Sequence, residues 1–243
     1  GRNALQAQNF TTATNNYNVG VGFAAGTAIT TGTLNTLIGG LAGDALTTGN
    51  NNVAFGYEAL SADTLGDRNV AIGTQALKTQ NFTTTTDAYN VAVGFTAGAS
   101  ITTGSLNTLI GGLSGDAFDT GVRNTAIGYA TLSGDTKGDN AVALGYGTLS
   151  VQNFTTNTDN YNTAVGYNAG NQITTGVSNT ILGGLAGDAL TDADFNVALG
   201  RSALGADTLG SKTTAVGYGA LQTQNFSTAT DSHNTAVGYN AGA

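Results

Sequence analysis

The chain has 243 residues, of which 37 are glycine, and only 9% are charged, against about a quarter in an ordinary soluble domain. Its net charge of −8 argues against binding to a nucleic-acid backbone, which needs clustered lysine and arginine. Cysteine, proline, methionine and tryptophan are absent, which excludes a disulfide framework and a thiolate metal site. A single histidine, His233, and a single glutamate, Glu58, exclude a multi-histidine metal site and a pair of glutamates.

No apolar run approaches the roughly 18 residues that a membrane-spanning helix needs, so we expect no membrane insertion. The sequence shows no signal peptide and no initiating methionine, and we therefore expect an uncapped segment of a longer fibre. The composition predicts neither a cofactor nor a metal. It also argues against an enzyme, because an active site is a unique set of polar residues and the polar residues here recur in equivalent copies.

One short motif recurs along the whole chain: asparagine, valine or threonine, a residue that is mostly alanine, an apolar residue and glycine. Residues 69–73, 124–128 and 234–238 are clear copies. With the final glycine as a landmark, one step of twenty-one is followed by three of seventeen, and together they form a super-repeat of seventy-two. The landmarks lie at positions 1, 22, 39, 56, 73, 94, 111, 128, 145, 166, 183, 200, 217 and 238. No unrelated linker interrupts them, so we expect one continuous domain over residues 1–243.

The motif predicts a short β-strand before each landmark glycine, from 19–21 near the start to 235–237 near the end. A second short strand is predicted between landmarks, for example at 28–31 and 44–47, followed by a turn at a glycine. Seventeen residues are too few for a helical hairpin repeat, and the glycine, asparagine, threonine and valine content disfavours helix. The predicted fold is therefore an all-β solenoid, a parallel β-roll of about fourteen coils.

The two faces of the predicted strand are both largely apolar. The residue before the landmark glycine is always apolar, and the residue two earlier is valine or threonine. The opposite face carries mostly alanine, with larger side chains at Leu37, Leu109 and Ile181. This pattern is typical of a strand that is covered on both sides. An identical chain is the simplest cover for the outer face, so we expect a homo-oligomer.

The asparagine that opens the motif is predicted to stack on its copies, so that the amides form a hydrogen-bonded ladder along the axis. Ala141 and Thr213 interrupt the series. Its members are Asn18, Asn35, Asn52, Asn69, Asn90, Asn107, Asn124, Asn162, Asn179, Asn196 and Asn234.

The segment from Asn162 to Gly170 reads N-T-A-V-G-Y-N-A-G, and the segment from Asn69 to Ala76 is closely similar. These motifs resemble the head repeats of trimeric autotransporter adhesins, and similar repeats occur in bacteriophage tail-fibre proteins. The resemblance covers essentially the whole chain and implies a homotrimer of parallel β-rolls that binds a host surface. The coils here are longer than the adhesin unit, and the sequence shows neither a heptad stalk nor a membrane anchor.

The acidic residues recur in equivalent sets and are predicted to serve turns by bonding nearby backbone. Residues 39–44 resemble part of a calcium-binding nonapeptide repeat, but the spacing differs by one and the motif never occurs in tandem. His233 lies where the other super-repeats have tyrosine and is predicted to be a loop residue. The acidic sets are Asp63, Asp135 and Asp207; Asp44, Asp116 and Asp188; and Asp87, Asp159 and Asp231.

Two sets of aromatic residues could bind a partner. One follows the landmark glycines and could stack on sugar rings or anchor a protein, or else share the parity of the inward aliphatic residues and fill the corner of the coil, the interpretation that we favour. The other lies in the segment Q-N-F-T/S that lengthens every fourth step, and could equally be a spacer. The two sets are Phe23, Tyr57, Phe95, Tyr129, Tyr146, Tyr167, Tyr218 and Tyr239, and Phe10, Phe82, Phe154 and Phe226.

The sequence thus predicts a non-catalytic structural or adhesive fibre segment, extracellular on a cell surface or a virion, that projects or mediates attachment to a surface. Its expected partners are further copies of itself, as a homotrimer or end to end, and a surface glycan or host receptor. The alternatives are a self-assembling homopolymeric extracellular filament and a carbohydrate- or calcium-binding lectin-like rod.

Overall fold

The computed structural model describes all of residues 1–243, which form strands and turns and no helix. Contacts divide the chain into two compact units, an N-terminal unit of Gly1–Val122 and a C-terminal unit of Arg123–Ala243. Thirteen three-residue strands each end directly before a landmark glycine. The predicted all-β parallel solenoid is therefore confirmed, with about thirteen turns instead of fourteen, since no strand precedes Gly1. The single continuous domain stays a prediction.

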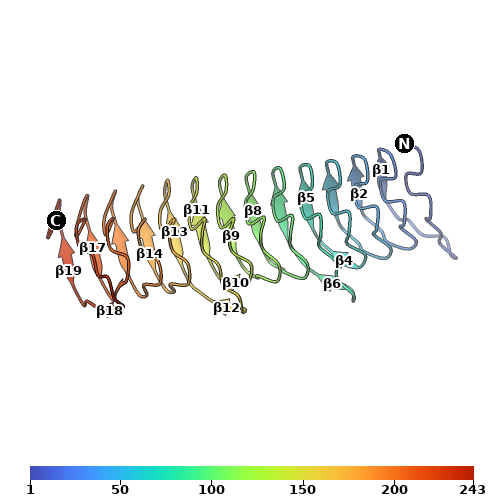
Figure 1. The fold of residues 1–243 in the computed structure, drawn as a ribbon. Coiled ribbons are helices and arrows are strands. Elements are labelled where there is room, and N and C mark those ends of the chain that lie inside the picture. The colour runs from blue at the N-terminus through green and yellow to red at the C-terminus, as the bar shows by residue number, and fades with distance from the viewer. The chain divides into compact units, whose positions relative to one another are not determined.

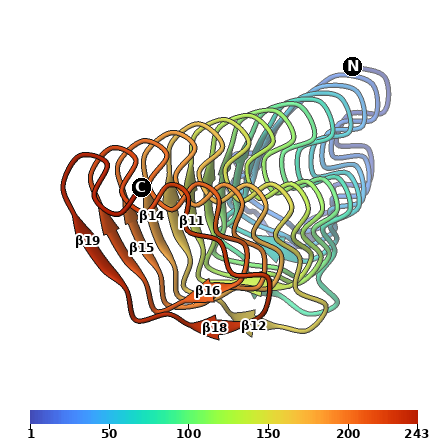
Figure 2. The same cartoon turned by 60° about the vertical axis from the view of Figure 1, so that its left-hand side comes forward.

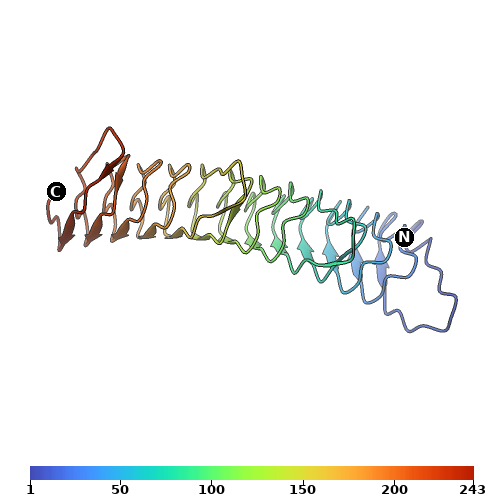
Figure 3. The same ribbon diagram turned by 90° about the horizontal axis from the view of Figure 1, so that it is seen from below.

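Each strand pairs in parallel with the equivalent strand of the next coil in its unit, as in the register of Val53 with Thr36 and with Val70 (Figure 1). The N-terminal unit contains β1 (Val19–Val21), β2 (Thr36–Ile38), β3 (Val53–Phe55), β5 (Val70–Ile72), β7 (Val91–Val93) and β8 (Thr108–Ile110). The C-terminal unit contains β9 (Thr125–Ile127), β11 (Val142–Leu144), β13 (Thr163–Val165), β14 (Thr180–Leu182), β15 (Val197–Leu199), β17 (Thr214–Val216) and β19 (Thr235–Val237). In each unit the strands lie along one side of the coils (Figure 3).

Three of the four long coils, which contain the inserted segments, pair with the coil before them through additional two-residue strands that the sequence did not indicate. The inserted segment extends the loop and pairs with the coil before it, which is visible at β12 and β18 in Figure 2. The pairs are β4 (Gly66–Asp67) with β6 (Thr86–Asp87), β10 (Gly138–Asp139) with β12 (Thr158–Asp159), and β16 (Gly210–Ser211) with β18 (Thr230–Asp231).

The second strand predicted at 28–31 and 44–47 is wrong, because this return segment is a series of turns. Bonds to the next coil, such as Ala28 N–H to the Asp44 carbonyl at 3.1 Å, alternate with bonds inside the coil, such as Ile29 N–H to the Gly26 carbonyl at 3.1 Å. Left-handed backbone at Ala24 and Gly26, with φ of 55° and 59°, shortens the path and prevents an extended ladder.

The assignment of the aliphatic residue before the landmark glycine to the interior is also wrong. In every three-residue strand except the terminal β1 and β19 the middle residue points inward and is buried, such as Ala54, whereas Val53 and Phe55 on either side face outward. Because so short a coil is narrow, the strand contributes mainly alanine to the core. Larger side chains of the return segment, such as Leu46 and Phe118, fill the remaining space and are fully buried.

The landmark glycines let consecutive coils approach closely. Gly39 has a φ of 139°, and a Cβ atom there would overlap the carbonyl oxygen of Gly56 in the next coil. Both observations require glycine, since no L side chain fits this conformation at this spacing.

The predicted asparagine ladder is confirmed. Asn52 is fully buried, and its N–H and Nδ2 both donate to Oδ1 of Asn35, at 3.0 and 3.2 Å. Its Nδ2 also donates to the Gly66 carbonyl at 2.9 Å, and its Oδ1 accepts from Asn69 in the following coil. Each amide thus satisfies buried polar groups in two coils and the turn beside them.

Candidate functional site

The strand residues that face outward form an apolar surface in each unit. We define the outer face as the first and third residues of every three-residue strand, all of which are valine, threonine, isoleucine, leucine or phenylalanine. Several are well exposed, including Val21 at 53% and Phe55 at 55%. The third residues are all aliphatic or phenylalanine and seven of the thirteen first residues are threonine, so the outer face is uncharged and largely apolar. An exposed face of this kind is typical of an interaction surface.

The residues that follow the landmark glycines extend this surface. We call these eight residues the aromatic column: Phe23, Tyr57, Phe95, Tyr129, Tyr146, Tyr167, Tyr218 and Tyr239. Their exposure runs from 43% at Tyr218 to 75% at Tyr239. They share the parity of the third strand residue, as predicted, but that parity faces outward, so the interpretation as corner-filling side chains is wrong.

Within the C-terminal unit three tyrosines of the column stack on one another. The ring centroids of Tyr129 and Tyr146 lie 5.5 Å apart, as do those of Tyr146 and Tyr167, with interplanar angles of 17° and 16°. Tyr218 and Tyr239 form a second stack at 5.3 Å. The coil spacing sets these distances, so the exposed rings are held in fixed positions at low entropic cost.

The phenylalanines of the inserted segments are mostly turned away from solvent. Phe82 and Phe154 are 6% and 5% exposed, and Phe10 and Phe226 are half-buried. The rings of Phe82 and Phe154 are therefore part of the packing of the long coils and are not presented to a ligand.

A polar network, buried or partly buried, anchors three of the four inserted segments. Oδ1 of Asp63 accepts from the backbone N–H of Gly66 at 3.0 Å and of Phe82 at 3.3 Å, while its Oδ2 accepts from Nε2 of Gln80 at 2.6 Å. Oε1 of Gln80 then accepts from Nδ2 of Asn90 in the ladder at 2.8 Å. Equivalent bonds recur at Asp135 and Gln152 and at Asp207 and Gln224. The prediction that this acidic set bonds the backbone of nearby turns is therefore confirmed.

Burial raises the pKa of Asp63 above its ordinary value of 3.8. Between pH 3.8 and the raised pKa, the folded chain therefore retains a proton that the unfolded chain has released. We therefore expect the free energy of unfolding to rise as the pH falls from neutral through the raised pKa, and to level off near 3.8. Asp63→Asn should flatten this rise in urea unfolding measured across the pH range. As a control, Asp231→Asn should change the slope in the opposite sense, because Lys212 lowers the pKa of Asp231. An unaltered slope in Asp63→Asn would contradict the assignment.

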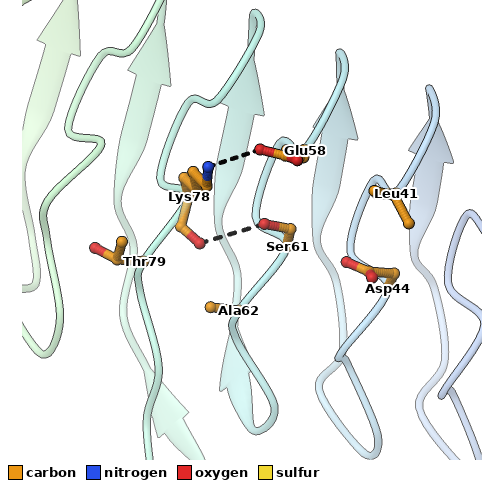
Figure 4. Close-up of a pocket in the computed structure, with 7 residues that line it drawn as sticks. All are labelled: Leu41, Asp44, Glu58, Ser61, Ala62, Lys78 and Thr79. Carbon is orange, nitrogen blue, oxygen red and sulfur yellow. Dashed lines mark hydrogen bonds and ion pairs between the residues drawn. The ribbon is translucent and has the colours of Figure 1, made fainter.

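A pocket of about 240 Å³ in the N-terminal unit is lined by Asp44, Glu58 and Lys78, which belong to three successive coils (Figure 4). Oε2 of Glu58 lies 2.7 Å from Nζ of Lys78 and accepts from Nε2 of Gln75 at 2.9 Å. Hydrogen bonds from Lys78, Gln75 and Tyr57 lower the pKa of Glu58 to about 2, so this carboxylate is a poor proton acceptor.

The second carboxylate of this pocket behaves like its copies elsewhere in the chain. Burial raises the pKa of Asp44, and it equally raises the pKa values of Asp116 and Asp188, although Ala130 and Ser202 replace Glu58 beside them. The raised pKa therefore belongs to the repeat and not to a carboxylate pair specialised for acid–base chemistry.

The third acidic set reaches the coil before its own. Asp87 pairs with Arg68, and Asp231 pairs with Lys212. Oδ1 of Asp159 accepts from Nδ2 of Asn140 in the coil before, and it lies 3.5 Å from the guanidinium of Arg123, two coils before. These carboxylates tie the inserted segments to the preceding coil, where nearby backbone had been predicted as their partner. His233 is exposed with a φ of 51°, and its equivalents Tyr17, Tyr89 and Tyr161 have φ of 50–52°, which confirms a shared loop position.

No group of three or more histidine, cysteine, aspartate or glutamate side chains is arranged to hold a metal ion. No helix in the chain is long and apolar enough to cross a membrane. Comparisons with protein-family models, with curated proteins and with solved structures found no match to this chain.

Proposed function

We propose that the chain is a non-catalytic segment of an extracellular fibre, an adhesin or a phage tail fibre, whose copies associate side by side as a homotrimer through the outer face. The observation that carries the proposal is the exposed, uncharged outer face flanked by the aromatic column. The trimer follows from the resemblance of the repeats to trimeric adhesin heads. A location on a cell surface or a virion follows from the same resemblance.

The size of the outer face agrees with a stable interface. With strands about 4.8 Å apart and about 3.3 Å per residue, the six strands of the N-terminal unit with their aromatic column cover about 480 Å². The seven strands of the C-terminal unit cover about 550 Å² by the same geometry. Each unit by itself therefore supplies more than half of the roughly 800 Å² that each partner buries in a standard protein–protein interface.

Sedimentation equilibrium tests the proposal. We expect the chain, of 24.1 kDa, to sediment as a particle of three chains, whereas unlimited growth would favour the end-to-end filament. Phe55→Lys should raise the dissociation constant at least tenfold, because association would bury an unpaired charge. The same charge at Ser100, an exposed residue of the return segment, should leave association unchanged. A chain that stays monomeric at all concentrations would overturn the proposal.

The tyrosine stack supports a second candidate function, binding of carbohydrate along the C-terminal unit. The three stacked rings at 5.5 Å spacing present a regular row of ring edges and hydroxyl groups, which can contact a sugar through apolar contacts and hydrogen bonds. Binding to a glycan array should be lost in the Tyr129→Ala, Tyr146→Ala double variant. Equal binding by the variant, or none by either protein, would remove this candidate.

A further inference from the structure

The position directly after each landmark glycine carries a large side chain in most coils and no side chain in others. The residue after the landmark glycine is aromatic in eight coils, but it is glycine at positions 40, 112 and 184, each one super-repeat from the next. Thr74 and Arg201 occupy the same position in other coils. The backbone of this position therefore accepts branched, aromatic and long charged side chains.

The fold of the chain itself does not require glycine at position 40 or 184. None of the three has a positive φ. A Cβ atom at Gly40 would meet only the ring of Tyr57, at 3.5 Å, and one at Gly184 would meet only the carbonyl oxygen of Tyr167, at 3.9 Å. Both are ordinary van der Waals distances, unlike the overlap at Gly39. Glycine costs backbone entropy on folding, and its use where a side chain has room indicates close approach by another molecule.

The partner that approaches must match the interval of the glycines. In the N-terminal unit Gly40 and Gly112 lie four coils apart, about 19 Å at about 4.8 Å per coil. Phe23 and Phe95, in the same unit, are separated by the same four coils and are exposed. In the C-terminal unit Tyr167 precedes Gly184 by one coil, as Phe23 precedes Gly40. A second copy of this chain therefore carries protruding rings at the spacing of the glycines.

We propose that Gly40, Gly112 and Gly184 are seats in the outer surface that receive rings of the aromatic column of a second copy of this chain. This inference rests on the proposed self-association and adds its register. The seats lie beside the outer face, which is uncharged, so apolar contact continues from the strands onto the seated ring. Seat and ring recur together every four coils, so a register that seats one ring of a unit also seats the ring four coils away.

The test fills two seats and measures association. In the Gly40→Phe, Gly184→Phe double variant each chain should fold as before, because Phe23 and Phe95 occupy equivalent positions in the native chain. Sedimentation equilibrium should show the dissociation constant raised at least tenfold. The matched control is Ser100→Phe with Gln172→Phe, two exposed residues of the return segment that are equivalent in successive super-repeats. The control should associate like the unmodified chain.

The outcomes separate this inference from the proposed function. Association of the seat variant at the strength of the unmodified chain would overturn the seats while leaving the fibre proposal intact. A monomeric unmodified chain would overturn both. If the phenylalanine variant unfolds, Gly40→Ala with Gly184→Ala replaces it, since a Cβ has room at both places. That variant should weaken association at least twofold, and an unchanged dissociation constant would overturn the seats.

Discussion

Replacing Phe118 by alanine should lower the free energy of unfolding by about 3–5 kcal/mol, the range for a fully buried phenylalanine. Phe118 is the largest side chain that is completely buried, and it fills the space between strand and return segment. The narrow coil cannot collapse around the loss, because closely spaced landmark glycines hold neighbouring coils in place. Urea unfolding followed by circular dichroism measures the change.

The control for Phe118→Ala uses the same residue type in the same unit. Phe95 belongs to the aromatic column and is 60% exposed, so Phe95→Ala should cost less than about 1 kcal/mol in the unassociated chain. Similar losses from the two substitutions would mean that the interior and the outer surface have been assigned the wrong way round.

The second large effect concerns the asparagine ladder where it meets an inserted segment. Asn69→Ala removes the Oδ1 atom that accepts from the backbone N–H of Asn90 at 3.2 Å and leaves that buried donor unpaired. We expect a loss of about 2 kcal/mol, the middle of the range for an unsatisfied buried polar group. Thermal or urea unfolding of the single variant gives the value.

The next super-repeat of the native chain satisfies the equivalent backbone N–H in another way. In the next super-repeat alanine stands at position 141, the equivalent of 69, and Oδ1 of Asn160 accepts from Asn162 N–H at 2.9 Å instead. Position 88 is the equivalent of 160, so adding Ala88→Asn to Asn69→Ala should recover more than half of the lost stability. A double variant no more stable than the single one would show that the acceptor role is not transferable between these positions.

The repeat length, the strands before each landmark glycine and the asparagine ladder could all be predicted, because each depends on a pattern at fixed spacing. Which strand face is internal could not, since Val53, Ala54 and Phe55 are all apolar. The choice depends on size, because the inward Ala54 shares its narrow coil with the fully buried Leu60 of the return segment. The sequence also does not predict that Asn160 accepts the hydrogen bond that an asparagine at position 141, the equivalent of Asn69, would accept. That substitution depends on contacts between coils, which the repeat spacing alone does not reveal.

The candidate site was found in part. The aromatic column could be located from its position after the landmark glycines, but its exposure was predicted wrongly, because the aliphatic residues of the same parity were assigned to the interior. The three seat glycines carry a usable signal, since glycine stands where other copies hold Phe23, Thr74 or Arg201. Only the coordinates separate them from glycines that the backbone needs, such as Gly39.

The asparagine ladder has a direction. Asn35, Asn107 and Asn179 each donate to the asparagine of the coil before, at 2.9 to 3.3 Å, and no step in this series is reversed. The amide dipoles of a unit therefore align and polarise one another. A block of four coils that begins at Asn35, Asn107 or Asn179 ends at Asn90, Asn162 or Asn234, so it offers an asparagine acceptor to its successor and the same donors to its predecessor. Such blocks can be duplicated or deleted without leaving a ladder amide unpaired. The length of the molecule can therefore change in evolution by whole blocks.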